Sequence, residues 1–304
     1  MTTVLTDADV ARHLTPADAV RWMGEAVDHH RGELVAPPRV HAELGDGRLV
    51  FTTGRLYGAW FGCRSYNTFP GGPGAQVVAV HDEAGGALRA AAVGSELGPR
   101  RAGAIGGVAA DALARPDAAT VAVIGSGVQA GMQVWGLSAV RRIRELRVHS
   151  RHLDRRDAFA TRVAPLVAGV VVPVADARTA LEGADIVVLA TSSPVPVVEA
   201  SWLSPGAYVT TVGPKQQGRA EFGLDLPAAA DVVVADSLAQ VAAYDPPNVL
   251  VGSPHLDRLV SLGAVRAGSV AAPAPASVRV FFSVGLAGTE AYLLDRLASS
   301  LRGS

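Results

Sequence analysis

A glycine turn follows directly on a short apolar run in the stretch Thr120–Ala130, which reads TVAVIGSGVQA. The valines and isoleucine indicate a buried parallel strand, and apolar residues at helical spacing follow the turn. Gly125 can adopt the backbone angles of a tight turn, and Gly127 lets the main chain approach a pyrophosphate. The free N–H groups and the dipole of the helix that follows favour phosphate. The residues predicted to hold a dinucleotide here are Gly125, Ser126, Gly127, Val128, Gln129 and Ala130.

The end of the next predicted strand distinguishes NAD from NADP. An NAD site usually has Asp or Glu there, about 20 residues past the glycines, to bind the ribose hydroxyls. This chain instead has Ser150 and Arg151, with Arg155 close behind. An acid would repel a 2′-phosphate, whereas a hydroxyl and guanidinium groups bind it. We therefore expect NADP(H) as the preferred cofactor and NAD(H) as the second choice, against the alternative of a solvated basic loop.

Lys215 is the only lysine among the 27 basic residues; the others are all arginine. It is either a chance survivor or a residue that arginine cannot replace. Arginine stays protonated in proteins, whereas a partly desolvated lysine among other cations can release its proton near neutral pH. Lys215 is therefore a candidate proton donor, and a charge anchor for a second substrate carboxylate is the alternative role.

Composition narrows the class of protein. The 304 residues are 49% hydrophobic and 18% charged and include 33 glycines, as in α/β enzymes. A net charge of −1 gives no electrostatic case for nucleic acid or a membrane surface as partner. Cys63 is the only cysteine, which excludes an intramolecular disulfide, and no metal-ligand spacing is present. Without a signal-peptide pattern or a long apolar run, we expect a cytoplasmic protein.

Element patterns predict two domains. A helix is expected from Thr15 to Arg31, with Thr15 as its N-cap, and another over Arg101–Ala114. Between them, consecutive strand patterns indicate an antiparallel or mixed sheet over Leu49–Thr53, Ala59–Tyr66, Gln76–His81 and Ala87–Val93.

From Ala119 onward strands alternate with helical segments, which predicts a Rossmann-type doubly wound parallel sheet. Its strand candidates are Val121–Ile124, Leu146–Ser150, Val170–Val174, Ile186–Thr191, Tyr208–Val212 and Val232–Ala235. The predicted nucleotide domain covers residues 118–274. The strand Val278–Phe282 and the helix Gly288–Leu301 are expected to return to the first domain, which then comprises residues 1–117 and 275–304.

The chain resembles the ornithine cyclodeaminase/mu-crystallin family along nearly its whole length. Five motifs carry the resemblance in the family's order, at Leu97–Ala104, Val123–Ala130, Ser150–Arg151, Leu189–Pro194 and Ser283–Ala287. The resemblance implies an α/β fold with a mixed-sheet α+β substrate and dimerisation domain beside the nucleotide domain. It also implies a homodimer and a small-molecule substrate whose carboxylate binds between the domains.

Site residues follow from the same resemblance. Arg39 and Arg101 occupy the positions of the family's carboxylate-binding arginines, and Arg64 stands where the family has a lysine with a catalytic role. Glu290 is the candidate for the family's C-terminal acid, on the substrate side. Lys215 takes the place of the catalytic Asp of cyclodeaminases. The positive charge of this lysine would repel the distal amine of ornithine or lysine. The cofactor is expected to be bordered also by Thr191, Ser192, Val212 and Gly213.

These residues favour an enzyme that transfers a hydride between NADP(H) and an α-imino or α-amino acid, as ketimine reductases and amino-acid dehydrogenases do. The arginines would hold the carboxylate and Lys215 would donate the proton. A cyclodeaminase-type ammonia lyase that uses bound NAD(H) is the first alternative. A mu-crystallin-like protein that binds NADPH and a small ligand is the second.

Overall fold

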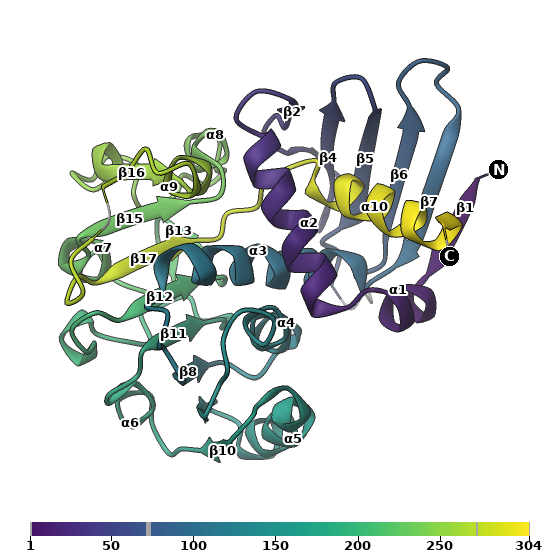
Figure 1. The fold of residues 1–304 in the computed structure, drawn as a ribbon. Helices are drawn as coiled ribbons and strands as arrows, with labels where there is room; N and C mark the ends of the chain where they lie inside the picture. Colours follow the sequence, from purple (N-terminus) through teal and green to yellow (C-terminus); the bar gives the residue numbers. More distant parts are fainter. Residues whose placement is uncertain (1, 71–73, 272, 304) are drawn as a thin grey trace. The chain divides into compact units, whose positions relative to one another are not determined.

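The chain folds into two compact units, seen in a computed structural model that describes residues 2–70, 74–271 and 273–303 (Figure 1). The first unit comprises Met1–Arg101 and Gly285–Ser304, and the second comprises Ala102–Val284. One boundary falls within the helix α3 (Leu97–Leu113), and the other follows the last strand of the chain. Both boundaries differ from the predicted ones at 117/118 and 274/275.

The described part of the first unit contains one mixed seven-stranded sheet, in the order β1-β7-β6-β5-β4-β2 with β3 paired to β4. β1 lies parallel to β7, and the other pairings are antiparallel. The expected mixed sheet is confirmed, although β1, β2 and β3 were not among the predicted strands. The strands are β1 (Thr3–Thr6), β2 (Leu34–Val35), β3 (Val40–Glu43), β4 (Arg48–Leu56), β5 (Trp60–Asn67), β6 (Gln76–Asp82) and β7 (Leu88–Gly94).

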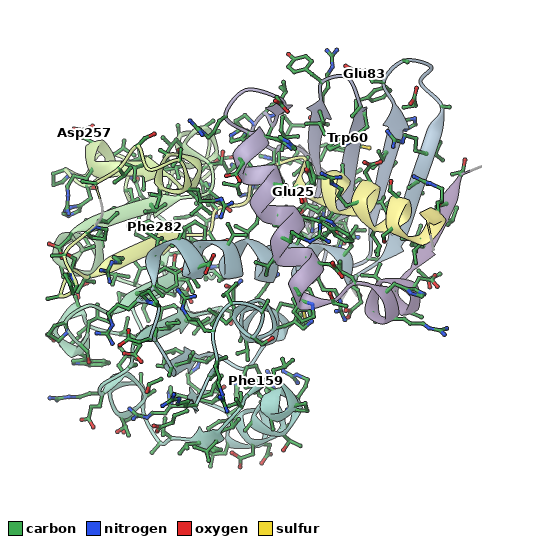
Figure 2. The ribbon with its side chains drawn as sticks, in the orientation of Figure 1. Glu25, Trp60, Glu83, Phe159, Asp257 and Phe282 are labelled. Carbon is green, nitrogen blue, oxygen red and sulfur yellow. The ribbon has the colours of Figure 1, made fainter. Side chains whose placement is uncertain are left out.

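Two helices cover one face of this sheet. α10 (Thr289–Gly303) packs on β5, β6 and β7 and against α2 (Pro16–His29), with α1 (Asp7–His13) preceding α2 (Figure 1). Trp60, labelled in Figure 2, meets Tyr292 of α10 edge to face, with 6.1 Å between ring centroids. Thr15 caps α2, as predicted, by accepting a hydrogen bond from the Asp18 amide. The exposed side chains of the opposite sheet face include Phe61, Val77 and Val93.

The second unit contains an eight-stranded parallel sheet among the described residues, in the order β10-β9-β8-β11-β12-β17-β15-β16. Several of its strands are short runs rich in Val, Ile and Ala, as expected where helices cover both faces. The doubly wound prediction is confirmed. The strands are β8 (Thr120–Ile124), β9 (Glu145–His149), β10 (Val170–Pro173), β11 (Ile186–Leu189), β12 (Tyr208–Thr211), β15 (Val232–Ala235), β16 (Leu259–Ser261) and β17 (Arg279–Phe282). The helices are α4 (Val128–Leu137), α5 (Leu153–Val163), α6 (Ala177–Leu181), α7 (Asp225–Ala229), α8 (Leu238–Ala242) and α9 (Leu262–Arg266).

The last strand corrects the predicted chain path. β17 was expected to return to the first domain, but it lies between β12 and β15 in the parallel sheet. Its residue Phe282, labelled in Figure 2, is fully buried in that sheet's core beside Phe222. Only the chain beyond it, with α10, belongs to the first unit. The predicted strand was right, and its assignment to a sheet was wrong.

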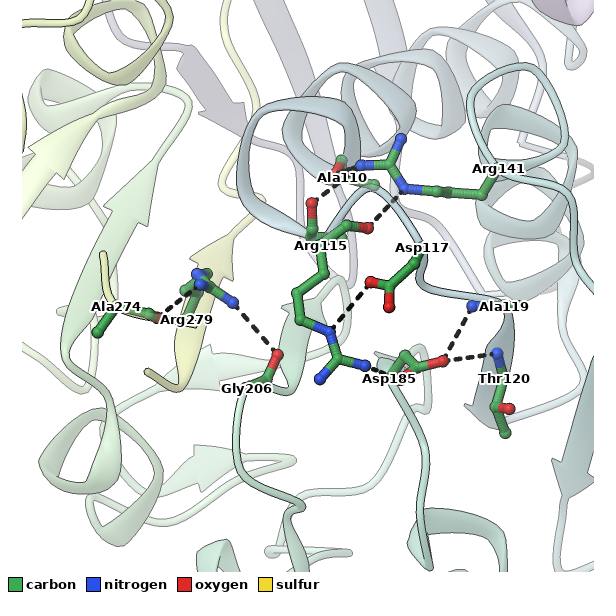
Figure 3. A network of polar contacts seen from close by, with 11 residues as sticks. Ala110, Arg115, Asp117, Ala119, Thr120, Arg141, Asp185, Gly206, Ala274 and Arg279 are labelled. Carbon is green, nitrogen blue, oxygen red and sulfur yellow. Dashed lines mark hydrogen bonds and ion pairs between the residues drawn. The ribbon is translucent and has the colours of Figure 1, made fainter. Parts of the chain in front are cut away.

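Charged side chains form a hydrogen-bond network at the end of the parallel sheet where β8 begins (Figure 3). Asp185 accepts hydrogen bonds from the amides of Ala119 and Thr120 and from Arg115. Arg141 donates to five main-chain carbonyls, among them those of Ala110, Ala114 and Arg115. This network fixes the start of the strand that leads into the glycine turn. No described helix is long and apolar enough to cross a membrane.

Candidate functional site

The turn after β8 depends on two glycines for different reasons. Gly125 has φ = +122°, and a Cβ there would clash with the Ala190 carbonyl oxygen. Gly127 is the N-cap of α4, has an ordinary φ of −81° and has open space on its Cβ side. No side chain caps α4, so its first N–H groups stay available to an anion.

A pocket of about 520 Å³ opens at this turn. It lies at the carboxyl ends of β8, β9, β11 and β12, where the strand order reverses, which is the usual ligand site of doubly wound sheets. Ala130 does not line it; this residue is fully buried and lets α4 pack closely, so its predicted contact with the cofactor is wrong. The other predicted cofactor residues all line the pocket: Gly125, Ser126, Gly127, Val128, Gln129, Ser150, Arg151, Arg155, Thr191, Ser192, Val212 and Gly213.

One end of the pocket is basic and rich in hydroxyl groups. The hydroxyls of Ser126 and Ser150 lie 3.0 Å apart, and the exposed side chains of Arg151 and Arg155 stand beside them. None of the described residues that line the pocket is acidic. His149, which the sequence analysis did not select, also lines this end, and its buried Nδ1 has no hydrogen-bond partner among the described atoms. A phosphate on the 2′-hydroxyl of a ribose would fit this set of donors.

The far end of the pocket depends on Glu221, a residue missed by the sequence analysis. Its fully buried carboxylate accepts hydrogen bonds from the Thr191 amide and hydroxyl, both at 2.8 Å, and from the Gly213 amide at 2.6 Å. Burial outweighs these donors and the nearby charge of Lys215, so the pKa of Glu221 is raised. The sequence did contain a pattern that points to Glu221. Gly218 lies between Lys215 and Glu221, and a short hairpin with a glycine turn brings residues on either side of it close together.

Lys215 itself is buried, with 2% of its surface exposed. It begins the short hairpin of β13 (Lys215–Gln216) and β14 (Arg219–Ala220), and its ammonium donates to the Gly213 carbonyl at 2.6 Å. Its charge also acts on the carboxylate of Glu221. Within this unit, the described surroundings of Lys215 therefore include a carboxylate and a carbonyl, whereas the sequence argument placed it among cations.

The first unit brings together three of the predicted site residues, the catalytic candidate Arg64 and the substrate candidates Arg101 and Glu290. Arg64 of β5 and Arg101 of α3 both donate to Oε1 of Glu290 on α10, Arg64 at 2.7 Å and Arg101 through Nε at 2.9 Å and through Nη2. Arg64 also lies over the ring of Tyr66, 4.1 Å from its centroid. Oε2 of Glu290 is buried and has no hydrogen-bond partner among the described atoms. These side chains come from positions 189 and 226 residues apart in the chain.

The charges of this cluster stabilise one another. Burial opposes ionisation of Glu290, but Arg101 and Arg64 outweigh it and the pKa of the carboxyl is lowered. Burial also lowers the pKa of Arg64, against the attraction of Glu290. Arg39 and Arg101 both approach Gly285, each with a terminal nitrogen 3.9 Å from the point that a Cβ would occupy there. Arg64 and Arg101 share the single carboxylate of Glu290, so this cluster carries more positive than negative charge, which suits an anion.

The sequence matches the profile of the Ornithine cyclodeaminase/mu-crystallin family over residues 1–295. The chain belongs to this family. It is 34% identical over 219 residues to an L-lysine cyclodeaminase of Streptomyces rapamycinicus, covering 71% of this chain and 62% of that one. It is 28% identical over 300 residues to an alanine dehydrogenase of Archaeoglobus fulgidus, covering 94% and 91%. A Thermococcus litoralis Δ1-pyrroline-2-carboxylate reductase, solved with NADH and L-proline, has the same fold, with a TM-score of 0.87, 23% identity and coverage of 98% and 96%.

Family membership confirms the resemblance seen in the five motifs. The chain spans 42% of the length of each of two rhizobial relatives, which are 40% and 37% identical to it. The named relatives include a cyclodeaminase, a dehydrogenase and a reductase, so the family holds more than one reaction on one fold. The choice among them depends on the residues of this chain.

Proposed function

We propose that the protein is an oxidoreductase that transfers a hydride between NADP(H) and an α-imino or α-amino acid, in the manner of ketimine reductases or amino-acid dehydrogenases. The observation that carries this proposal is the pocket at the carboxyl ends of β8, β9, β11 and β12, with its uncapped helix and its basic end. A relative named alanine dehydrogenase, similar over nearly the whole chain, supports the same class.

Different residues of the pocket would bind different parts of a nicotinamide dinucleotide. The N–H groups at the start of α4 would bind the pyrophosphate, and Ser150, Arg151 and Arg155 would bind the 2′-phosphate of NADP(H). Thr191 and Gly213 border the other half. When bound, the nicotinamide ring donates or accepts the hydride.

The arginines of the first unit would anchor the substrate carboxylate. A guanidinium meets a carboxylate with two parallel hydrogen bonds, and Arg39 and Arg101 both reach toward Gly285. Glu290 already holds Arg64 and Arg101 in fixed orientations, which reduces the entropy lost when an anion binds.

Imine reduction also requires an acid that keeps the imine nitrogen protonated, and we assign this role to Lys215. Substitution of this buried lysine tests the assignment, because arginine can replace its charge but not its ability to release a proton. Lys215→Arg and Lys215→Met are both expected to lose about 10²–10⁴-fold in kcat. Substrate affinity should be partly retained in Lys215→Arg. Near-normal kcat in Lys215→Arg would mean that only the charge matters and would refute the assignment.

The deciding experiment for the function is a screen of NADPH oxidation against cyclic and linear α-imino acids. Turnover with at least one imino acid, and a lower KM for NADPH than for NADH, would support the proposal. Ammonia release from ornithine or lysine without net NADPH turnover would select the cyclodeaminase alternative, to which the 34% identical relative belongs by name. Tight NADPH binding with no reaction across the panel would favour a binding protein.

We also propose that the protein is a homodimer joined through the first unit. Phe61, Val77 and Val93 are exposed on the sheet face opposite α10, although they are apolar and lie on neighbouring strands. A second copy would cover them. Light scattering coupled to size exclusion should give twice the chain mass, and Val77→Lys should shift the protein toward the monomer.

A further inference from the structure

Glu221 is a buried acid that the proposed reaction does not use. Its Oε2 accepts hydrogen bonds from the amide and hydroxyl of Thr191, and its Oε1 accepts one from the amide of Gly213. Thr191 lies just past β11 and Gly213 just past β12, and both line the nucleotide pocket. A single carboxylate therefore joins the ends of two adjacent strands at the edge of that pocket.

The surrounding chain is built around this carboxylate. A Cβ on Gly213 would clash with Oε2 of Glu221 and with the Thr191 carbonyl oxygen, so only glycine fits there. The Thr191 hydroxyl donates to Glu221 and accepts a hydrogen bond from the Ser193 amide at 3.1 Å, which fixes its orientation. The Gly213 peptide is held at its carbonyl as well, by the ammonium of Lys215 at 2.6 Å.

The order of the sheet indicates which half of the dinucleotide these strands serve. Ser150 and Arg151 follow β9, the glycine turn follows β8, and β11 and β12 come next in the sheet. A dinucleotide with its 2′-phosphate at the β9 end and its pyrophosphate over the turn must extend its other half across β11 and β12. Thr191 and Gly213 would then border the nicotinamide half.

We infer that Glu221 is a positioning residue of the nucleotide site, which holds Thr191 and Gly213 in place for the nicotinamide half of the cofactor and leaves the 2′-phosphate end untouched. The inference rests on the proposed function only in taking the pocket as a dinucleotide site. It requires no turnover.

The test compares whole cofactors with a fragment that carries only the adenosine end. Binding of NADPH, NADH and 2′,5′-ADP is measured by calorimetry for the unchanged protein and for Glu221→Gln. The amide keeps the size of the side chain but turns one acceptor into a donor, which faces either Gly213 or Thr191. We expect the Kd of NADPH and of NADH to rise by a similar factor, about tenfold or more. The Kd of 2′,5′-ADP should change less than about twofold, which is within the usual range for a site away from the substitution.

Two further variants guard this comparison. Glu199→Gln changes an exposed acid of the same unit and should leave all three constants unchanged. Thr191→Val removes the hydroxyl, which donates to Glu221 and accepts from the Ser193 amide, but keeps the bond from the Thr191 amide to Glu221. It should give a smaller loss with the same selectivity, even if Glu221→Gln does not fold. Equal losses for NADPH and 2′,5′-ADP would indicate a general disturbance of the pocket and overturn the inference, as would unchanged binding in both variants. A protein that binds NADPH with this selectivity but reduces no imine would overturn the proposed function alone.

Discussion

Each unit contains a buried glutamate, and the two carboxylates are stabilised in opposite ways. Glu290 in the first unit is bonded to two guanidinium groups, and their charges hold its pKa below the ordinary value although burial opposes this. Glu221 in the second unit is bonded to two amides and a hydroxyl, and burial raises its pKa despite the charge of Lys215. The first acid is held by opposite charge, and the second mainly by neutral donors.

The difference follows from what each unit is proposed to bind. In the first unit the cations are in excess, so Glu290 orients Arg64 and Arg101 without cancelling the charge that a substrate carboxylate needs. In the second unit the ligand surface is largely main chain, and Glu221 acts by fixing the Thr191 and Gly213 backbone. A buried carboxylate can therefore orient charged side chains, as Glu290 does, or hold main-chain segments in place, as Glu221 does.

The largest expected effect is on the first of these arrangements. Arg101→Met should lower the free energy of unfolding by about 3–5 kcal/mol, because it removes one of the two guanidinium groups that compensate the buried charge of Glu290. Urea denaturation with linear extrapolation measures this change.

The matched control is Arg48→Met in the same unit. Arg48 pairs with Glu43 at 2.7 Å, but both side chains are exposed to solvent, at 36% and 60%. Such a pair contributes at most about 1 kcal/mol. If Arg101→Met and Arg48→Met cost the same, burial of the charge pair is not what stabilises the first unit.

A second pair of variants distinguishes an effect on the stability of the nucleotide unit from an effect on NADPH binding. Gly125→Ala should lower the free energy of unfolding by about 2 kcal/mol, because φ = +122° is strained for alanine and its Cβ would meet the Ala190 carbonyl. Gly127→Ala should leave stability nearly unchanged but weaken NADPH binding, because its Cβ enters open space beside the pocket. Thermal denaturation and calorimetric binding on both proteins check this. Equal stability losses would show that the open side of Gly127 has no special relation to the ligand.

The sequence predicted the second unit well because its elements are locally encoded. Strands such as β8, β11 and β15 are short runs rich in Val, Ile and Ala, and the turn after β8 requires a glycine at position 125. The sheet membership of β17 was mispredicted because strand order depends on which neighbours pack, and an isolated strand pattern does not carry that information. The edge strand β1 was missed for the same reason, since its partner β7 lies more than 80 residues away.

The candidate site shows the same division between local and distant information. The predicted cofactor residues follow their strands in sequence, and all of them except Ala130 line the pocket. Arg64, Arg101 and Glu290 were each singled out, but no local pattern shows that both arginines meet one oxygen of the acid. Glu221 was missed because its role comes from the strand ends it contacts.

The opposite pKa shifts of the two acids give opposite dependences of stability on pH. An unfolded glutamate titrates near pH 4.3. Glu290 has a lowered pKa, so its contribution is present above that pH and is lost as the pH falls through its folded value. Glu221 has a raised pKa, so stability declines as the pH rises from about 4.3 through its folded value.

Unfolding free energies measured from pH 3 to pH 7 should therefore change in two distinct ways on substitution. Glu290→Gln should flatten the curve on the acid side, and Glu221→Gln should flatten the decline above about pH 4.3. Each can alter the slope by at most about 1.4 kcal/mol per pH unit, the value for one proton. Acid-side flattening in both variants would mean that the two carboxyls respond to burial alike, and the contrast between the units would fail.

The smallest expected effect concerns the exposed charges of the nucleotide unit. Arg151 lines the basic end of the pocket but is open to solvent, so its bond to a 2′-phosphate would be weakened by water and salt. Arg151→Ala should raise the Kd of NADPH about fivefold, or about 1 kcal/mol, and leave the Kd of NADH within a factor of two. Raising the salt concentration should narrow the difference between the two cofactors in the unchanged protein. NADPH and NADH differ only in the 2′-phosphate. An equal loss of affinity for both cofactors would therefore place Arg151 on a part that they share, such as the pyrophosphate, and would remove the sequence argument for NADP.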